Sequence, residues 1–102
     1  MYKYLNDLKS DTVKDVILDT DAYNEIDDQY AIAFAMLSKS RVNLLSINAA
    51  PFLNSRSTSA ADGMEKSYNE IFNIRGLVDK NSEIPVYRGS CEFMKDKNVP
   101  VE

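Results

Sequence analysis

The segment Val16-Ile17-Leu18-Asp19-Thr20-Asp21 decides the fold class of this chain. Its apolar run is typical of a buried strand in a parallel sheet, and the acidic residues mark the carboxyl end of that strand. A helical period follows, which predicts a helix from about Asp27 to Ser38. The apolar residues that define this period are spaced by four, four and three: Ile26, Tyr30, Phe34 and Leu37. Because the positions between them are also mostly apolar, we expect this helix to be buried.

The rest of the chain continues the alternation of strands and helices. Val42 to Ile47 predicts a second strand, and Ile84 to Tyr87 predicts a third. Between them we expect a helix that begins near Ser59 or Asp62, runs to about Arg75 and is closed by Gly76. Met64, Tyr68, Ile71 and Phe72 fall on one face of it.

This order of elements predicts an α/β fold with an open, mostly parallel, Rossmann-like sheet and flanking helices joined by right-handed crossovers. Sheets of this kind usually contain more than about three strands. We therefore expect residues 1–102 to form a single incomplete domain, the N-terminal portion of a larger one.

Composition limits the classes of partner. The chain has 102 residues, of which 44% are hydrophobic, so it can bury a core. Its 16 acidic and 12 basic residues give a net charge of −4, which argues against nucleic acid as a partner and favours small molecules or cations. With no histidine, any acid–base chemistry must begin with carboxylates. The lone Cys91, the polar N-terminus and the short apolar run Tyr30 to Leu37 predict a cytoplasmic protein without a membrane partner.

The candidate site is an acidic cluster. Five acids and no basic residue lie between Asp19 and Asp28. Bringing them together costs like-charge repulsion, which a helix N-terminus with about half an elementary charge cannot offset alone. A hard cation can, and calcium suits such ligands better than magnesium because it accepts more oxygens in looser geometry. The alternative is that Asp27 and Asp28 cap a helix while Asp19 and Asp21 lie in a solvated turn.

Two other motifs share parts of this pattern. A strand ending in Asp-x-Asp resembles the haloacid dehalogenase motif, in which Asp19 would be the nucleophile of a magnesium-dependent phosphotransferase. That motif has Thr or Val where this chain has Tyr23. A calcium loop of the EF-hand type needs alternating oxygen ligands and a central glycine, and Tyr23 and Glu25 break that pattern.

The full string, Val16 to Asp21 followed by Ile26 to Ala33, resembles the signature of the inosine-uridine preferring nucleoside hydrolase family. That family opens with an apolar strand, Asp-x-Asp, and an Asp-Asp pair that begins a helix. Leu44 to Asn54 is similar to its second strand and asparagine-bearing loop, and Ile84 to Gly89 is similar to its third strand. The similarity spans about residues 14–90. The spacer from Ala22 to Ile26 is two residues longer than the family's Pro-Gly-x, which indicates a divergent branch.

The resemblance implies a role for each acidic residue. Asp21 matches a calcium ligand that also acts as general base on a calcium-bound water, and Asp28 matches the second calcium ligand. Asp27 matches a ribose-binding carboxylate, and Asp19 a supporting acid beside the metal. Asn54 matches the asparagine near the attacking water, a position for which Asn48 competes.

The resemblance also implies the activity. It is hydrolysis of the N-glycosidic bond of a nucleoside or related N-riboside in purine or pyrimidine salvage, with Ca²⁺ as cofactor and a homo-oligomer when full length. The alternative is a non-catalytic calcium- or sugar-binding fragment, because the family's later aspartate ligand and leaving-group histidine have no counterpart in these residues.

Overall fold

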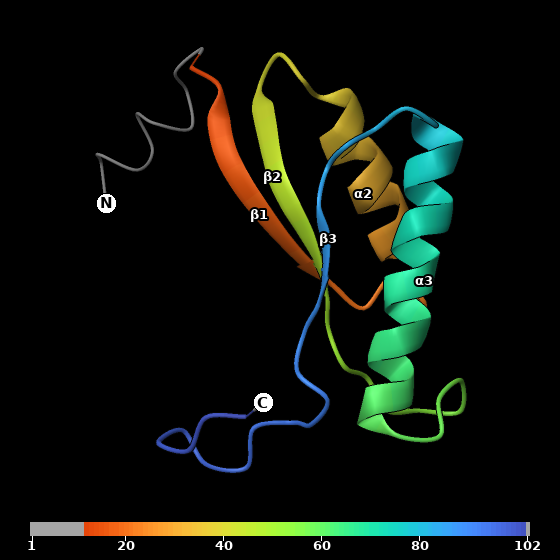
Figure 1. Cartoon of the computed structure of the whole chain (residues 1–102), viewed down its shortest axis with the longest axis vertical. Helices are drawn as coiled ribbons and strands as arrows, with labels where there is room; N and C mark the ends of the chain where they lie inside the picture. Colours follow the sequence, from red (N-terminus) through yellow and green to blue (C-terminus); the bar gives the residue numbers. More distant parts are fainter. Residues whose placement is uncertain (1–11, 102) are drawn as a thin grey trace.

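The structure is a computed structural model that describes residues 12–101. Its elements alternate between strand and helix: β1 (Lys14–Thr20), α2 (Ile26–Leu37), β2 (Val42–Ala49), α3 (Ala60–Val78) and β3 (Val86–Arg88). The strands form one parallel sheet in the order β1-β2-β3. Both helices cover the same face of this sheet (Figure 1). The predicted α/β class with an open parallel sheet is confirmed.

The sheet has one covered and one uncovered face within the described residues. Side-chain exposure alternates along β1, and Ile17 is 61% exposed whereas Val16 and Leu18 pack against the core. The prediction of a fully buried first strand is therefore wrong. The reason is that α2 and α3 lie on one side, so a side chain that points to the other side meets solvent. A register shift between Val16 and Ile17 interrupts the pairing with β2.

Helix α2 has nearly the predicted bounds but a different environment. Ile32 and Met36 are buried, and they contribute to the core against the sheet and α3. The four residues that defined the helical period are exposed by 59% to 74%: Ile26, Tyr30, Phe34 and Leu37. The prediction of a buried helix is wrong for this face, because the sheet and α3 contact α2 from the other side only.

Helix α3 begins as predicted and ends later. Ser59 is its N-cap and accepts a hydrogen bond of 3.0 Å from the backbone N–H of Asp62. Gly76 does not close the helix, which continues to Val78, and no glycine has a positive φ. The buried face of α3 includes Met64 and Ile71, as expected. Phe72 instead lies beside Tyr68 at the surface, with ring centroids 5.0 Å apart.

Two glycines allow backbones to approach closely. A Cβ on Gly63 would lie 2.1 Å from the carbonyl oxygen of Phe52, so α3 can pack on the loop after β2 only because this side chain is absent. A Cβ on Gly89 would lie 2.3 Å from the carbonyl oxygen of Ala49, to which the Gly89 N–H donates. Both contacts fix segments at the carboxyl end of the sheet.

The first turn of α3 provides a pH-dependent prediction. Asp62 accepts a hydrogen bond from the Thr58 N–H and forms an ion pair with Lys66, and these contacts lower the pKa of Asp62. Because the pKa of Asp62 is lower in the folded state, its ionised form stabilises the fold at pH values above 3.8, the ordinary aspartate pKa. This contribution is lost as the pH falls through the folded-state pKa. Asp62→Asn should therefore lower the melting temperature at pH 7 and have little effect in strong acid.

Ser59→Ala is the matched control for this measurement. It removes an uncharged N-cap and should cost about 1 kcal/mol with little dependence on pH. Thermal unfolding of both variants, followed by circular dichroism over a pH series, checks the difference. Parallel pH profiles for the two variants would contradict the assignment.

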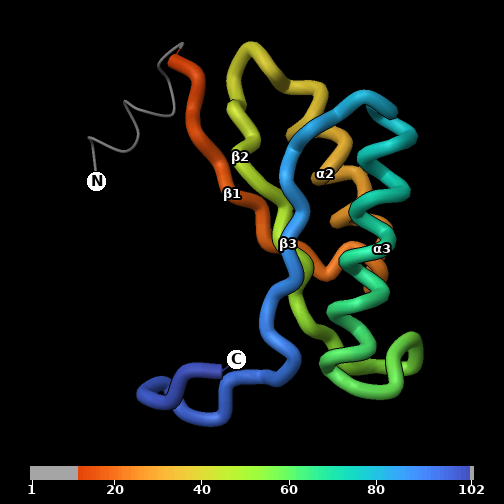
Figure 2. Tube along the Cα trace, in the orientation of Figure 1, coloured from red at the N-terminus to blue at the C-terminus, as the bar shows by residue number. Residues whose placement is uncertain are grey.

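The segment after β3 leaves the layered part of the molecule. Residues 91–100 are exposed, and their trace runs away from the two helices (Figure 2). Within residues 12–101, no helix combines the length and apolar character that crossing a membrane requires.

Candidate functional site

The candidate site is built on two carboxylates where β1 ends and α2 begins. Thr20, the last residue of β1, donates its hydroxyl to Oδ2 of Asp28 at 2.7 Å. The backbone N–H of Asp21 donates to the same oxygen at 3.2 Å. Asp28 lies in the first turn of α2, where the helix dipole favours a negative charge. These contacts bring Asp28 back onto the end of β1, next to Asp21.

A chain of amides extends from Asp21 to the loop after β2. Oδ2 of Asp21 accepts a hydrogen bond of 2.9 Å from the side-chain amide of Asn24. Asn24 in turn accepts a hydrogen bond from the side-chain amide of Asn54. Oδ1 of Asn54 accepts from the backbone N–H of Arg56 at 2.8 Å. The structure thus links Asp21 and Asp28 to Asn54, which lies about 30 residues further along the chain.

The turn that carries Asn24 is held in place by α3. The backbone N–H of Tyr23 donates to Oγ of Ser67, a fully buried residue of α3, at 3.3 Å. The Tyr23 ring stacks on Phe52 with centroids 6.4 Å apart, and Nζ of Lys66 lies 5.7 Å from the Tyr23 ring. Ala22 is fully buried. The spacer that departs from the nucleoside hydrolase pattern is therefore a packed turn.

The two carboxylates have opposite pKa shifts. Burial, followed by the contact with Asp28, raises the pKa of Asp21, and the Asn24 hydrogen bond only partly offsets this. Burial also acts to raise the pKa of Asp28, but the hydrogen bonds from Thr20 and Asp21 outweigh it and lower the pKa. The surroundings of the pair thus favour the charged form of Asp28 more than that of Asp21. Such a pair is strained by like charge when both groups ionise, and a cation would relieve that strain.

Among residues 12–101, neither Asp19 nor Asp27 forms a hydrogen bond with this pair. Asp19 is exposed, and its Oδ1 accepts a hydrogen bond of 2.9 Å from the side-chain amide of Asn48 on β2. It points to the uncovered face of the sheet, whereas Thr20 is buried on the helix side. Asp27 is exposed in the first turn of α2. Asn48, the competitor of Asn54, thus belongs with Asp19.

The carboxylates at this site are of the kind that binds calcium, but they are too few to fill its coordination shell. Asp21 and Asp28 supply hard carboxylate oxygens, whereas Asn24 turns its side-chain N–H toward Asp21 and its amide oxygen toward Asn54. The amide oxygen of Asn54 accepts from the Arg56 N–H. Within residues 12–101, no group of three or more acidic or cysteine side chains gathers as a metal site would require. A calcium ion takes six to eight oxygens, so one bound here would need further ligands from water, backbone carbonyls or other residues.

Sequence reasoning missed Thr20 and Asn24. Thr20 lies inside the motif and Asn24 follows Asp21 by three residues, with a turn hydrogen bond of 2.7 Å from the Asn24 N–H to the Asp21 carbonyl. Asp and Asn side chains commonly bond across such short turns, so this spacing was the available signal.

Comparison with protein-family models, with curated proteins and with solved structures gave no match.

Proposed function

We propose that this chain provides the calcium-binding part of an N-glycosidase site that hydrolyses nucleosides or related N-ribosides. The observation that carries the proposal is the contact between Asp21 and Asp28 at the carboxyl end of β1, where parallel α/β sheets bind ligands. The sequence resemblance assigns calcium ligation to these same two residues. Asn54, the third residue of that assignment, reaches Asp21 through Asn24.

The chemistry requires a base, a cation and negative charge near the sugar. A bound calcium ion would lower the pKa of a coordinated water molecule. Asp21, which the resemblance matches to a general base, would accept the proton of the attacking water. Asp28 would hold the same cation, and negative charge beside the sugar would stabilise the positive charge that develops on the ribose as the N-glycosidic bond breaks.

Asp27 and Asn54 complete the proposed roles. Asp27 is exposed one residue before Asp28, and we assign it to a ribose hydroxyl. Asn54 orients the attacking water from the loop after β2. Asp19 faces the other side of β1 and is bonded to Asn48, so we assign it no part in holding the metal.

The geometry favours this proposal over a phosphotransferase that uses Asp19. Such an enzyme needs the nucleophile and the second acid of Asp-x-Asp around one magnesium ion. Among the described residues, Asp19 is bonded to Asn48, whereas Asp21 pairs with Asp28. A binding module without catalysis shares the calcium site and differs only in turnover.

Release of free ribose from a nucleoside panel that includes inosine and uridine tests the proposal. The assay uses a protein in which the rest of the proposed site, with its further metal ligand and leaving-group acid, accompanies this chain. With that protein we expect ribose release in the presence of calcium and its loss after chelation by EGTA. Asp21→Asn should reduce the rate at least about 100-fold, because it removes the base. Glu83→Gln, which removes one negative charge from an exposed side chain just before β3, should leave the rate unchanged.

The outcomes separate the candidate functions. Calcium binding without ribose release from any nucleoside supports the binding module and contradicts hydrolysis. Magnesium-dependent release of phosphate from phosphate esters, abolished by Asp19→Asn and retained in Asp28→Asn, supports the phosphotransferase.

A further inference from the structure

Thr20 is the residue whose side chain joins β1 to the second carboxylate of the candidate site. It is only 4% exposed, and its hydroxyl donates to Oδ2 of Asp28 at 2.7 Å. A distance this short is typical of a hydroxyl that donates to an ionised carboxylate, which is one of the stronger hydrogen bonds in proteins. The Asp21 N–H donates to the same oxygen at the longer distance of 3.2 Å. Thr20 is therefore the closer of the two donors that hold Asp28.

We propose that Thr20 is a positioning residue of the calcium site, which holds the Asp28 carboxylate in the orientation that binds the ion. Because Asp28 is a calcium ligand only under the function proposed above, this inference rests on that proposed function. The resemblance gives roles to Asp19 and Asp21, the neighbours of Thr20 in the chain, and none to Thr20 itself.

The hydroxyl of Thr20 projects from a fixed backbone. Thr20 pairs with Ala49 of β2 in the parallel sheet, and its carbonyl oxygen accepts a hydrogen bond of 2.8 Å from the Ala50 N–H. A β-branched side chain has few rotamers at χ1, so a fixed backbone also restricts the direction of the hydroxyl. Groups carried by a paired strand hold a site more precisely than groups carried by a loop.

Asp28 needs such a partner because its own helix supplies none. It is the third residue of α2, and the N-cap Glu25 makes no side-chain hydrogen bond to that first turn. Within residues 12–101, the hydrogen bonds that reach the Asp28 carboxylate come from Thr20, the last residue of β1, and from Asp21, which follows it. The orientation of Asp28 is thus set from the end of the strand.

The two donors also determine which oxygen remains for a cation. A carboxylate oxygen offers about two lone pairs, and Oδ2 of Asp28 already accepts from two donors. Oδ1 is therefore the oxygen that is left for an ion. Without the Thr20 hydroxyl, the carboxylate could rotate and exchange its two oxygens. Hydrogen bonds that orient a metal ligand in this way typically change the metal affinity by roughly 10- to 100-fold when they are removed.

Calcium titration calorimetry on three variants of the chain tests the proposal. Thr20→Val keeps the branched shape of the side chain and removes the hydroxyl, so it should weaken calcium binding about 10-fold or more. Thr20→Ser should bind calcium within about threefold of the original chain, because it keeps the orienting hydrogen bond. Ser46→Ala removes another buried hydroxyl, on β2, and should leave the affinity unchanged.

Thermal unfolding of the same variants separates positioning from a purely structural role, since this hydrogen bond also ties α2 to β1. Thr20→Ser loses a buried methyl group, so it should melt below the original chain and still keep its calcium affinity. A purely structural role predicts instead that the affinity of each variant falls together with its melting temperature.

Equal losses of affinity in Thr20→Val and Thr20→Ser would overturn the inference, and so would an unchanged affinity in Thr20→Val. Either result would leave the calcium site itself in place. If the original chain binds no calcium, the proposed function and this inference both fail.

Discussion

Replacing Asp21 by asparagine is expected to lower the calcium affinity of the chain at least on the order of 10- to 100-fold. Loss of a mere supporting contact in a metal site typically weakens binding by this factor, and Asp21 is proposed as a direct ligand. Asp28→Asn should have a similar effect, because both variants remove one of the two charges that meet at the end of β1. Titration calorimetry with calcium chloride measures both changes.

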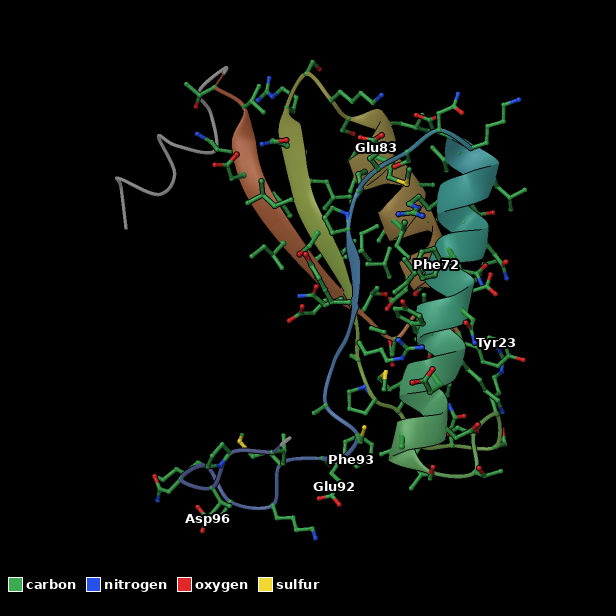
Figure 3. All side chains as sticks on the ribbon, viewed as in Figure 1. Tyr23, Phe72, Glu83, Glu92, Phe93 and Asp96 are labelled. Atoms are coloured by element: carbon green, nitrogen blue, oxygen red, sulfur yellow. The ribbon has the colours of Figure 1, made fainter. Side chains whose placement is uncertain are left out.

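Two further variants serve as controls for this calorimetry experiment. Asn24→Ala removes the amide that holds Oδ2 of Asp21, so it should weaken calcium binding less than Asp21→Asn does. Glu83→Gln changes the net charge by the same amount as Asp21→Asn does. Glu83 lies near the opposite end of the sheet from the turn that contains Tyr23 (Figure 3). This variant should leave the affinity unchanged. An equal loss in Glu83→Gln would show that only the overall charge matters, and unchanged affinity in Asp21→Asn would refute the site.

Gly63→Ala is expected to destabilise the fold by about 3 kcal/mol or more, the upper end of what overpacking costs. The added Cβ would lie 2.1 Å from the carbonyl oxygen of Phe52, so the backbone must move. That carbonyl also accepts a hydrogen bond of 3.0 Å from Ser57, which holds the loop that carries Asn54. We expect a melting temperature lower by more than about 10 °C.

Gly76→Ala, in the same helix, should have the opposite sign. Nothing lies within 4 Å of the position that a Cβ on Gly76 would occupy, and a glycine inside a helix costs roughly 0.5 to 1 kcal/mol relative to alanine. This variant should therefore melt about 3 to 6 °C higher. Thermal unfolding of both variants compares them directly. Similar shifts in the two variants would show that the close contact between α3 and Phe52 does not govern stability.

The α/β class and the order of the elements could be predicted from local sequence patterns. Apolar runs and helical periods placed both helices within a few residues of their observed ends, and Ser59 identified the start of α3, because these features depend on local contacts. The same local reasoning placed Asp21 and Asp28 at one end of a strand and one end of a helix.

The packing of the helices on the sheet sets which faces are buried and which partners these residues contact. Periodicity indicates that Tyr30 and Phe34 share a face, but their exposure depends on where the sheet and α3 lie. The link from Asp21 through Asn24 to Asn54 depends on a turn that is pinned to Ser67, 44 residues away from Tyr23. Asp19 and Asp21 differ by two positions in sequence, yet the chain leaves the strand between them, and they meet different neighbours. Contacts between distant segments set these outcomes, and no local pattern encodes them.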